Sequence, residues 1–234
     1  SCCCAILNST LPAVRFKPHW RGFLSSGNSL KRISVFIDYQ NVYMRARQVF
    51  FNKGFHPNTS GQIDPSALGI LLASRIPNSI LQNVYIYKSL PSVLDNKNFA
   101  PTRKQISVWE AKPMVEVKTL PLKYPKIHEV RAGQTKPREK GIDVLLAIDF
   151  ATKAFKNEFD IGIIFSVDSD LKPALFFVED PAIKSVAQVA AWRKLGSDLN
   201  LARTRLSIGG NRPFCHWLDF NDFQKVRDDT KYSR

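Results

Sequence analysis

The chain has 234 residues, of which 44% are hydrophobic and 23% are charged, so it can bury a sizeable core and is not a disordered or low-complexity protein. No stretch approaches the ~20 consecutive apolar residues of a membrane span, and the apolar run near the start is too short for a signal peptide. The formal net charge of +14 favours a polyanionic partner, above all nucleic acid, over a basic surface without a role.

Residues 1–30 show neither helical nor strand periodicity. Pro12 and Pro18 interrupt them, and the adjacent cysteines at 2–4 cannot close a tetrahedral zinc site. We therefore expect an irregular N-terminal extension outside a single folded domain over residues 31–232. The cysteines form no disulfide framework, so a reducing, cytoplasmic setting is the expectation.

The first predicted strand is an apolar run that ends at Asp38, with Asn41 three residues later. A short helix is expected over residues 42–51, then a loop over 52–62. Asp64 is a typical N-cap, and a proline at the first position suits the helix predicted through residue 74.

The middle of the chain alternates between strand and helix. Residues 79–87 and 115–117 have the apolar patterns of strands, and residues 98–111 keep a helical period. This alternation predicts an α/β fold, a Rossmann-like three-layer α/β/α sandwich with a mostly parallel central sheet.

Residues 118–140 break the alternation and are predicted to form a long basic loop. Loops of this length are usually functional or disordered. The loop leads towards the next helix, so we expect its basic side chains to hold nucleic-acid phosphates; a solvated linker without a role is the alternative. These side chains are Lys118, Lys123, Lys126, Arg131, Lys136, Arg138 and Lys140.

The next helix is predicted from the apolar spacing of residues 140–150. Asp143 falls in its first turn, where the helix dipole favours an anion. Asp149 lies six residues further on and points to another face, so we expect it to support the site from behind or to be a surface acid.

A continuous apolar run over residues 161–165 is typical of a strand buried on both faces of a parallel sheet. It ends in Ser166, Val167 and the pair Asp168 and Asp170. Open α/β sheets bind ligands at this end of their strands, so two clustered carboxylates indicate a divalent-metal site. The alternative is that Ser169 or Asp170 caps the next helix.

The rest of the chain continues the alternation. We predict a helix over residues 171–178, a strand over 184–191, irregular structure over 192–203, a last strand over 214–218 and a helix through 226 capped by Asp219. Acids from three segments, Asp38, Asp143 and the Asp168–Asp170 pair, then converge on an oxygen-lined pocket suited to Mg²⁺ or Mn²⁺.

Three blocks in this order, V-F-I-D-Y-Q-N, K-G-I-D-V-L-L-A-I-D and I-I-F-S-V-D-S-D-L-K-P, resemble the signature blocks of NYN domains, which belong to the PIN-like superfamily of metal-dependent ribonucleases. The resemblance implies RNA hydrolysis by metal-activated water. It implies that the ion is held by Asp38, Asp143, Asp168 and Asp170.

The resemblance implies that Asn41 lies beside these acids and orients a water, a ligand or the substrate. We expect Ser166 to hydrogen-bond a neighbouring carboxylate and fix its rotamer. The chain departs from the family pattern at Val167, where glycine is common. Two other functions stay open: a non-catalytic RNA-binding or scaffold protein that keeps the fold, and a 5′-nuclease-like enzyme acting on DNA.

Overall fold

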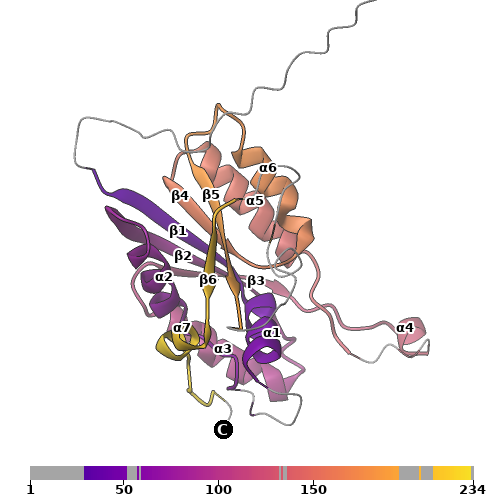
Figure 1. Cartoon of the computed structure of the whole chain (residues 1–234). Coiled ribbons are helices and arrows are strands. Elements are labelled where there is room, and N and C mark those ends of the chain that lie inside the picture. The colour runs from indigo at the N-terminus through magenta and orange to yellow at the C-terminus, as the bar shows by residue number, and fades with distance from the viewer. Residues whose placement is uncertain are drawn as a thin grey trace, which may run out of the picture.

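The computed structural model describes residues 29–51, 57, 59–131, 133, 136–194, 206 and 213–232. Within these ranges six parallel strands form one sheet in the order β3-β2-β1-β4-β5-β6 (Figure 1). The strands are β1 (Lys31–Asp38), β2 (Ser79–Leu90), β3 (Val115–Pro121), β4 (Ile161–Phe165), β5 (Val186–Trp192) and β6 (Cys215–Leu218). The helices are α1 (Tyr39–Phe50), α2 (Pro65–Ser74), α3 (Asn96–Glu110), α4 (Ile127–Arg131), α5 (Ile142–Phe155), α6 (Lys172–Val178) and α7 (Phe220–Val226), with a 3₁₀ turn, η1 (Ser169–Leu171), before α6.

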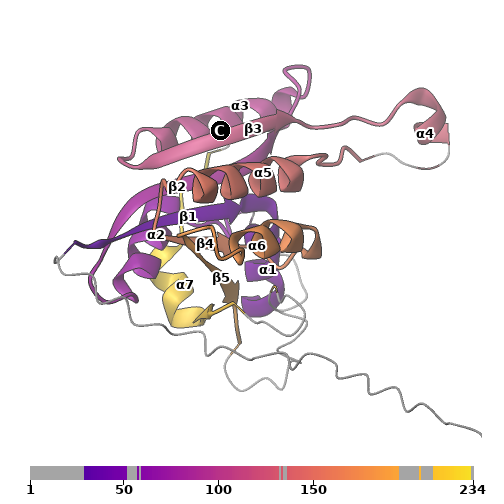
Figure 2. The ribbon, with the colours of Figure 1, turned by 90° about the horizontal axis from the view of Figure 1, so that it is seen from above.

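Helices cover both faces of the sheet, which makes three layers (Figures 1 and 2). Side chains alternate between the faces along each strand. On β1, Val35 and Ile37 join the core beneath α1, α2 and α7, whereas Phe36 faces α5 and joins the core on that side. The predicted three-layer α/β sandwich is confirmed, and its sheet is parallel throughout the described strands.

The core beneath α5 is built from aromatic rings and depends on a glycine in β4. The rings of Phe36 and Phe150 meet edge to face with centroids 5.0 Å apart, and Phe159 packs beside both. A Cβ atom on Gly162 would lie 2.5 Å from the Phe159 ring and 2.6 Å from the Phe150 ring, so any larger residue would collide with this cluster.

The strand order reverses between β1 and β4. The chain first builds outward through β1, β2 and β3, then crosses back so that β4 pairs with β1 on its other side. The carboxyl ends of β1 and β4 therefore flank a topological switch point, the position at which open α/β sheets form a ligand-binding crevice.

Most elements lie close to where the sequence predicts them. Asp64 caps α2, its carboxylate accepting hydrogen bonds from the amides of Ser66 (3.0 Å) and Ala67 (3.3 Å). At the other end of the chain, Asp219 and Asp222 form a capping box at the start of α7. The predicted N-terminal extension lies outside the described residues except for 29 and 30, as does most of the segment predicted to be irregular over 192–203.

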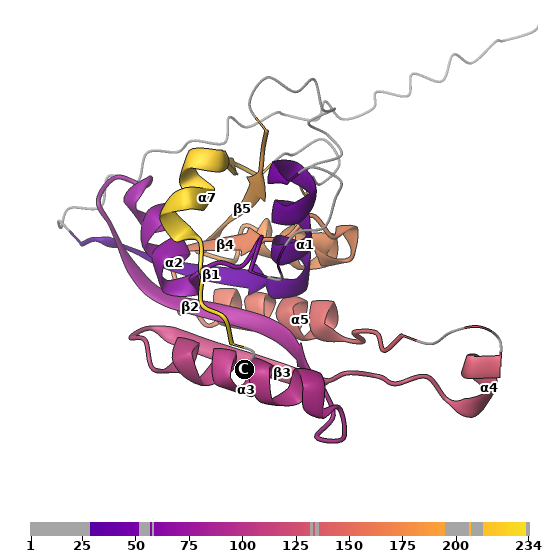
Figure 3. The same cartoon turned by 90° about the horizontal axis from the view of Figure 1, so that it is seen from below.

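The segment 118–140 differs from the predicted structureless loop. Its first residues belong to β3, and the rest forms an arm that projects from the body and carries α4 at its tip (Figures 2 and 3). At the base of the arm, Lys123 and Arg138 exchange two backbone hydrogen bonds of 3.0 Å each. Sequence periodicity cannot reveal this pairing because it joins positions fifteen residues apart in an antiparallel bridge.

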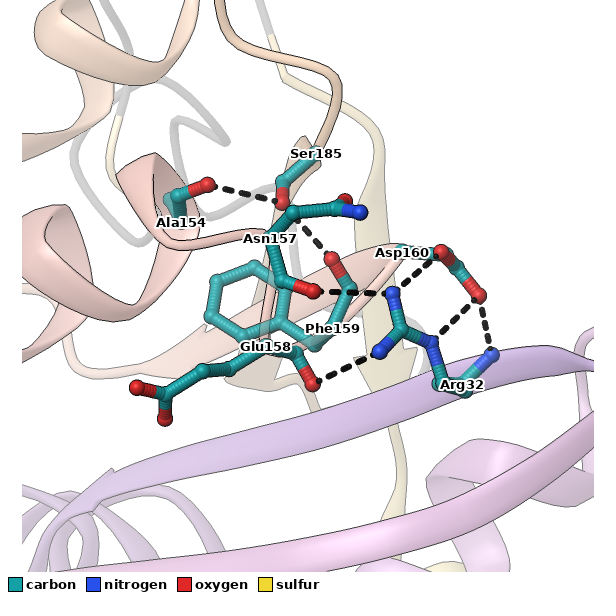
Figure 4. A network of polar contacts seen from close by, with 7 residues as sticks. All are labelled: Arg32, Ala154, Asn157, Glu158, Phe159, Asp160 and Ser185. Atoms are coloured by element: carbon teal, nitrogen blue, oxygen red, sulfur yellow. Dashed lines mark hydrogen bonds and ion pairs between the residues drawn. The ribbon is translucent and has the colours of Figure 1, made fainter.

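The amino ends of β1, β4 and β5 are joined by a network of polar contacts (Figure 4). The Arg32 backbone amide donates to Asp160 (2.7 Å), and its guanidinium binds both carboxylate oxygens of Asp160 (3.0 and 3.2 Å) and the carbonyl of Asn157 (2.9 Å). The Ser185 hydroxyl donates to the carbonyl of Phe159 (2.6 Å). The hydrogen bonds from Arg32 hold the pKa of Asp160 below its ordinary value.

In the ranges that the structure describes, no helix is both long enough and apolar enough to cross a membrane.

Candidate metal centre

Asp38 is the last residue of β1 and its carboxylate is buried, with a residue exposure of 6%. It also caps α1, since Oδ1 accepts a hydrogen bond from the Asn41 amide (3.2 Å). The other oxygen, Oδ2, accepts from the hydroxyl of Ser166 (3.0 Å). The predicted contact between Ser166 and a neighbouring carboxylate is therefore present.

The polar groups that follow β1 and β4 are bound to each other. The Asn41 side-chain oxygen accepts from the Val167 amide (3.2 Å), and the Ser166 hydroxyl accepts from the Asp168 amide (3.1 Å). Val167 is not among the described residues with a positive φ, so replacing the family's usual glycine introduces no backbone strain. These bonds position Asp38 and Asp168 on either side of the switch point.

Asp168 also begins the turn that leads into α6. Its Oδ1 accepts from the Asp170 amide (3.0 Å), which makes Asp168 the N-cap of η1. The sequence alternatives placed a cap at Ser169 or Asp170, and the structure gives that role to Asp168. Asp168 is half-buried, whereas Asp170 is exposed to solvent.

Burial raises the pKa of Asp38 to about 6. Its hydrogen bonds from Asn41 and Ser166 oppose this rise, and repulsion from the carboxylates of Glu139 and Asp168 adds to it. Among the described residues no cation pairs with Asp38. An anion that is buried beside two further acids is costly, and a bound cation would relieve that cost.

Sequence reasoning did not single out Glu139. It lies in the lead-in to α5 and is half-buried, and its carboxylate accepts a hydrogen bond from the Ser89 amide at the end of β2 (3.0 Å). The hydroxyl of Ser89 is itself buried without a hydrogen-bond partner in the described part of the chain. The available signal was that Glu139 is one of two acids in a mainly basic segment and lies two residues before the glycine that precedes the predicted helix.

Asp143 lies in the first turn of α5, as predicted, two residues after the N-cap Gly141, which has a left-handed conformation (φ 82°). It is half-buried, and α5 contacts η1. Within the described part of the chain, no side chain forms a hydrogen bond or ion pair with Asp143. The same part contains no group of three or more His, Cys, Asp or Glu residues arranged to hold a metal ion.

The structure therefore brings Asp38, Asn41, Ser166 and Asp168 into one hydrogen-bonded group, with Glu139 beside it. The side chains of Asp143 and Asp170 have no hydrogen bond to this group in the described part of the chain. The donors fit a hard divalent cation in their chemistry, since all are carboxylate, amide or hydroxyl oxygens.

Asp149 lies apart from this group. It accepts a hydrogen bond from the Tyr87 hydroxyl (2.7 Å) and pairs with the ammonium of Lys118, which also lies 3.4 Å from Glu116. Lys118 belongs to β3 rather than to the projecting arm, and acids within the fold neutralise its charge.

The remaining predicted RNA-binding residues lie on or beside the arm: Lys123 is half-buried near its base, and Lys126, Arg131, Lys136, Arg138 and Lys140 are exposed.

A parallel α/β sheet with acids at its switch point is the architecture of the PIN-like ribonucleases, and the family model of the NYN domain matches residues 32–186, from the start of β1 to the start of β5. The chain belongs to the NYN domain family of the PIN-like ribonuclease superfamily.

Among solved structures, a protein of unknown function from Vibrio parahaemolyticus, VPA0982, is similar in part. It is 16% identical, the match covers 71% of this chain and 84% of that chain, and the TM-score is 0.46. Comparison with curated proteins finds no match.

Proposed function

We propose that the protein is a divalent-metal-dependent ribonuclease that hydrolyses RNA phosphodiester bonds at the switch point between β1 and β4. The observation that carries the proposal is the buried carboxylate of Asp38, which has two acids beside it and no cation paired with it among the described residues. In a member of a ribonuclease superfamily, such a group is best explained as a binding site for Mg²⁺ or Mn²⁺.

Asp38 and Asp168 would hold the ion, and Glu139 is close enough to Asp38 to add charge to the site. Asp143 and Asp170, which the family resemblance also implies as ligands, remain predicted ligands. A bound divalent ion lowers the pKa of water and neutralises charge that develops on the phosphate.

The chain's own residues position these acids. Asn41 and Ser166 bind Asp38 and the β4 loop together, so they fix the direction in which each carboxylate oxygen faces. The exposed arm residues Lys126, Arg131 and Lys136 would bind backbone phosphates without reading the base sequence.

The test uses Asp168→Asn, because asparagine is also a good N-cap and should keep η1 intact. Under the proposal, the variant loses Mn²⁺-dependent cleavage of single-stranded RNA while its melting temperature without metal stays the same or rises. Mn²⁺ should stabilise the wild type by mass action and stabilise the variant much less.

Glu110→Gln, an exposed acid at the end of α3, is the matched control and should behave as the wild type. Equal stabilisation of both proteins by Mn²⁺, with cleavage intact in Asp168→Asn, would contradict the assignment. Parallel assays on duplex DNA and on flap substrates separate a 5′-nuclease from a ribonuclease, and binding of RNA without cleavage would identify a non-catalytic RNA-binding protein.

A further inference from the structure

A cavity of about 520 Å³ lies beside the candidate metal centre, on the face of the sheet covered by α1 and α3. Side chains of α1, residues 57–62, the end of β2, α3 and the segment that follows α7 line it. Figure 3 shows this last segment running back from α7 towards α3. The lining side chains that matter here are Gln40, Tyr43, Lys88, Thr102, Gln105 and Lys231.

The lining has the chemistry of an anion site with many hydrogen-bonding groups. Two of its residues are lysines, three are glutamines and two are threonines, and none of the described lining residues is acidic. Such a surface attracts a negatively charged ligand that also offers hydroxyl and amide-like groups, and it repels a cation.

Lys88 is the most informative of these residues. Its Nζ lies 4.1 Å from the centroid of the Tyr39 ring and 5.7 Å from that of Trp109. No oxygen in the described part of the chain accepts a hydrogen bond from it. Burial lowers its pKa to about 8, and the attraction of the nearby Glu139 carboxylate only partly opposes this shift. An ammonium group held in this way would be stabilised by an anion that enters the cavity.

The cavity and the candidate metal centre share a wall. Tyr39 and Gln40 follow Asp38 directly, and Lys88 precedes Ser89, whose amide binds Glu139. Asp38 at the end of β1 is paired in register with Tyr87 of β2, the neighbour of Lys88. A polynucleotide with one phosphate at Asp38 would therefore extend to this cavity within a nucleotide or two.

We propose that the cavity is a nucleotide subsite, in which Lys88 pairs with a phosphate and the glutamine and threonine side chains bind the sugar and base of a residue next to the cleaved bond. The inference rests on the proposed ribonuclease function for the identity of the polymer. The occupant is thus a nucleoside phosphate unit rather than a bare anion.

The experiment titrates each of the four nucleoside 5′-monophosphates into the full chain in the presence of EDTA, using the fluorescence of the tryptophans, one of which adjoins Lys88. Lys88→Met keeps the length of the side chain and removes its charge, so affinity should fall on the order of tenfold, as expected for a lost charge pair. Lys104→Met, an exposed lysine of α3 outside the cavity lining, is the matched control and should bind as the wild type.

Gln40→Ala, at an exposed position on the cavity wall, keeps the test decisive if Lys88→Met fails to fold, and it too should weaken binding. Wild-type protein that binds none of the four nucleotides overturns the proposal. So does inorganic phosphate that binds as tightly as the nucleotides, because the cavity would then hold an anion only.

Asp168→Asn separates the two proposals. It should lose RNA cleavage and keep nucleotide binding. Protein that binds nucleotides through Lys88 but cleaves no RNA refutes the ribonuclease and leaves the subsite in place, whereas cleavage without nucleotide binding refutes the subsite alone.

Discussion

The two ends of the central sheet differ in how their acidic side chains are neutralised. At the amino end, Arg32 binds Asp160 and lowers the pKa of that acid, and the guanidinium also donates to a nearby carbonyl. At the carboxyl end, Asp38 is buried beside other acids with no described cation, which raises its pKa. The acid at the amino edge is neutralised within the protein and therefore stabilises the fold. The buried acid at the carboxyl edge would be neutralised only by a bound cation, which suits a functional site.

The largest expected effect tests the carboxyl end. Asp38→Asn should lower metal-dependent RNA cleavage by on the order of 10³-fold, because the site loses a carboxylate that would hold the ion, and it is the ion that neutralises charge developing on the phosphate. At neutral pH its free energy of unfolding in the absence of metal should be unchanged or higher, since a buried charge is gone. Single-turnover cleavage with Mn²⁺ and urea denaturation measure the two quantities. A marked loss of stability with cleavage retained would make Asp38 a structural residue like Asp160.

The pH dependence of stability should differ between the ends. Folded Asp38 keeps its proton up to about pH 6, above its ordinary pKa of 3.8, so ionisation costs the folded state more than the unfolded one. The free energy of unfolding should therefore fall as pH rises from about 4 to about 6, by on the order of 3 kcal/mol, and level off above. The contribution of Asp160 to stability has the opposite pH dependence, because its pKa is lowered in the folded state. That contribution is present above the ordinary pKa of an aspartate and is lost as the pH falls below it.

Urea denaturation of metal-free protein over this pH range measures the effect, and Asp38→Asn should remove the fall. If the variant and the wild type follow the same curve, Asp38 does not carry the cost assigned to it.

At the amino end, Arg32→Met should lower the stability of the fold without changing the rate of RNA cleavage. The side chains of Arg32 and Asp160 are 37% and 40% exposed, so the ion pair itself adds little, and most of the loss comes from hydrogen bonds. We expect the free energy of unfolding to fall by about 1–2 kcal/mol, which lowers the melting temperature by several degrees. Cleavage per folded molecule should match the wild type. Lys156→Met, a nearby exposed lysine, is the control.

The smallest expected effect is that of Ser185→Ala. Its buried hydroxyl binds the carbonyls of Phe159 and Ala154 at the amino end. Removing it should cost about 1 kcal/mol without changing the rate of cleavage, and thermal melts with a parallel RNA assay test both statements. A change in cleavage rate would show that the two ends are coupled.

The elements were predictable because their patterns are local. The buried run of β4 and the Asp64 cap of α2 depend on neighbours in the sequence, and they lie where expected. Glu139 was not predicted, because its role depends on the end of β2, fifty residues away. Lys118 was assigned to the basic loop, but a long-range contact with Asp149 places its charge inside the fold. The cavity beside Lys88 brings together five segments, and no single stretch of sequence indicates it.

The site could be predicted only as a set of acids. The acids at the end of β1, in the first turn of α5 and after β4 lie where the sequence predicts them, but the sequence does not give the directions of their side chains. One carboxylate oxygen of Asp168 accepts a hydrogen bond from the turn that Asp168 begins, and Asp170 is exposed to solvent.

The pairing of β1 with β4 also has a consequence for how the protein is made. Ser166 and Asp38 are 128 residues apart, and β4 is the only described strand that brings them together. Contacts with such long separations form slowly during folding, because the intervening chain must first be closed into a loop. During synthesis on the ribosome, the two halves of the site therefore stay separate until β4 has emerged, so a nascent chain carries no assembled centre.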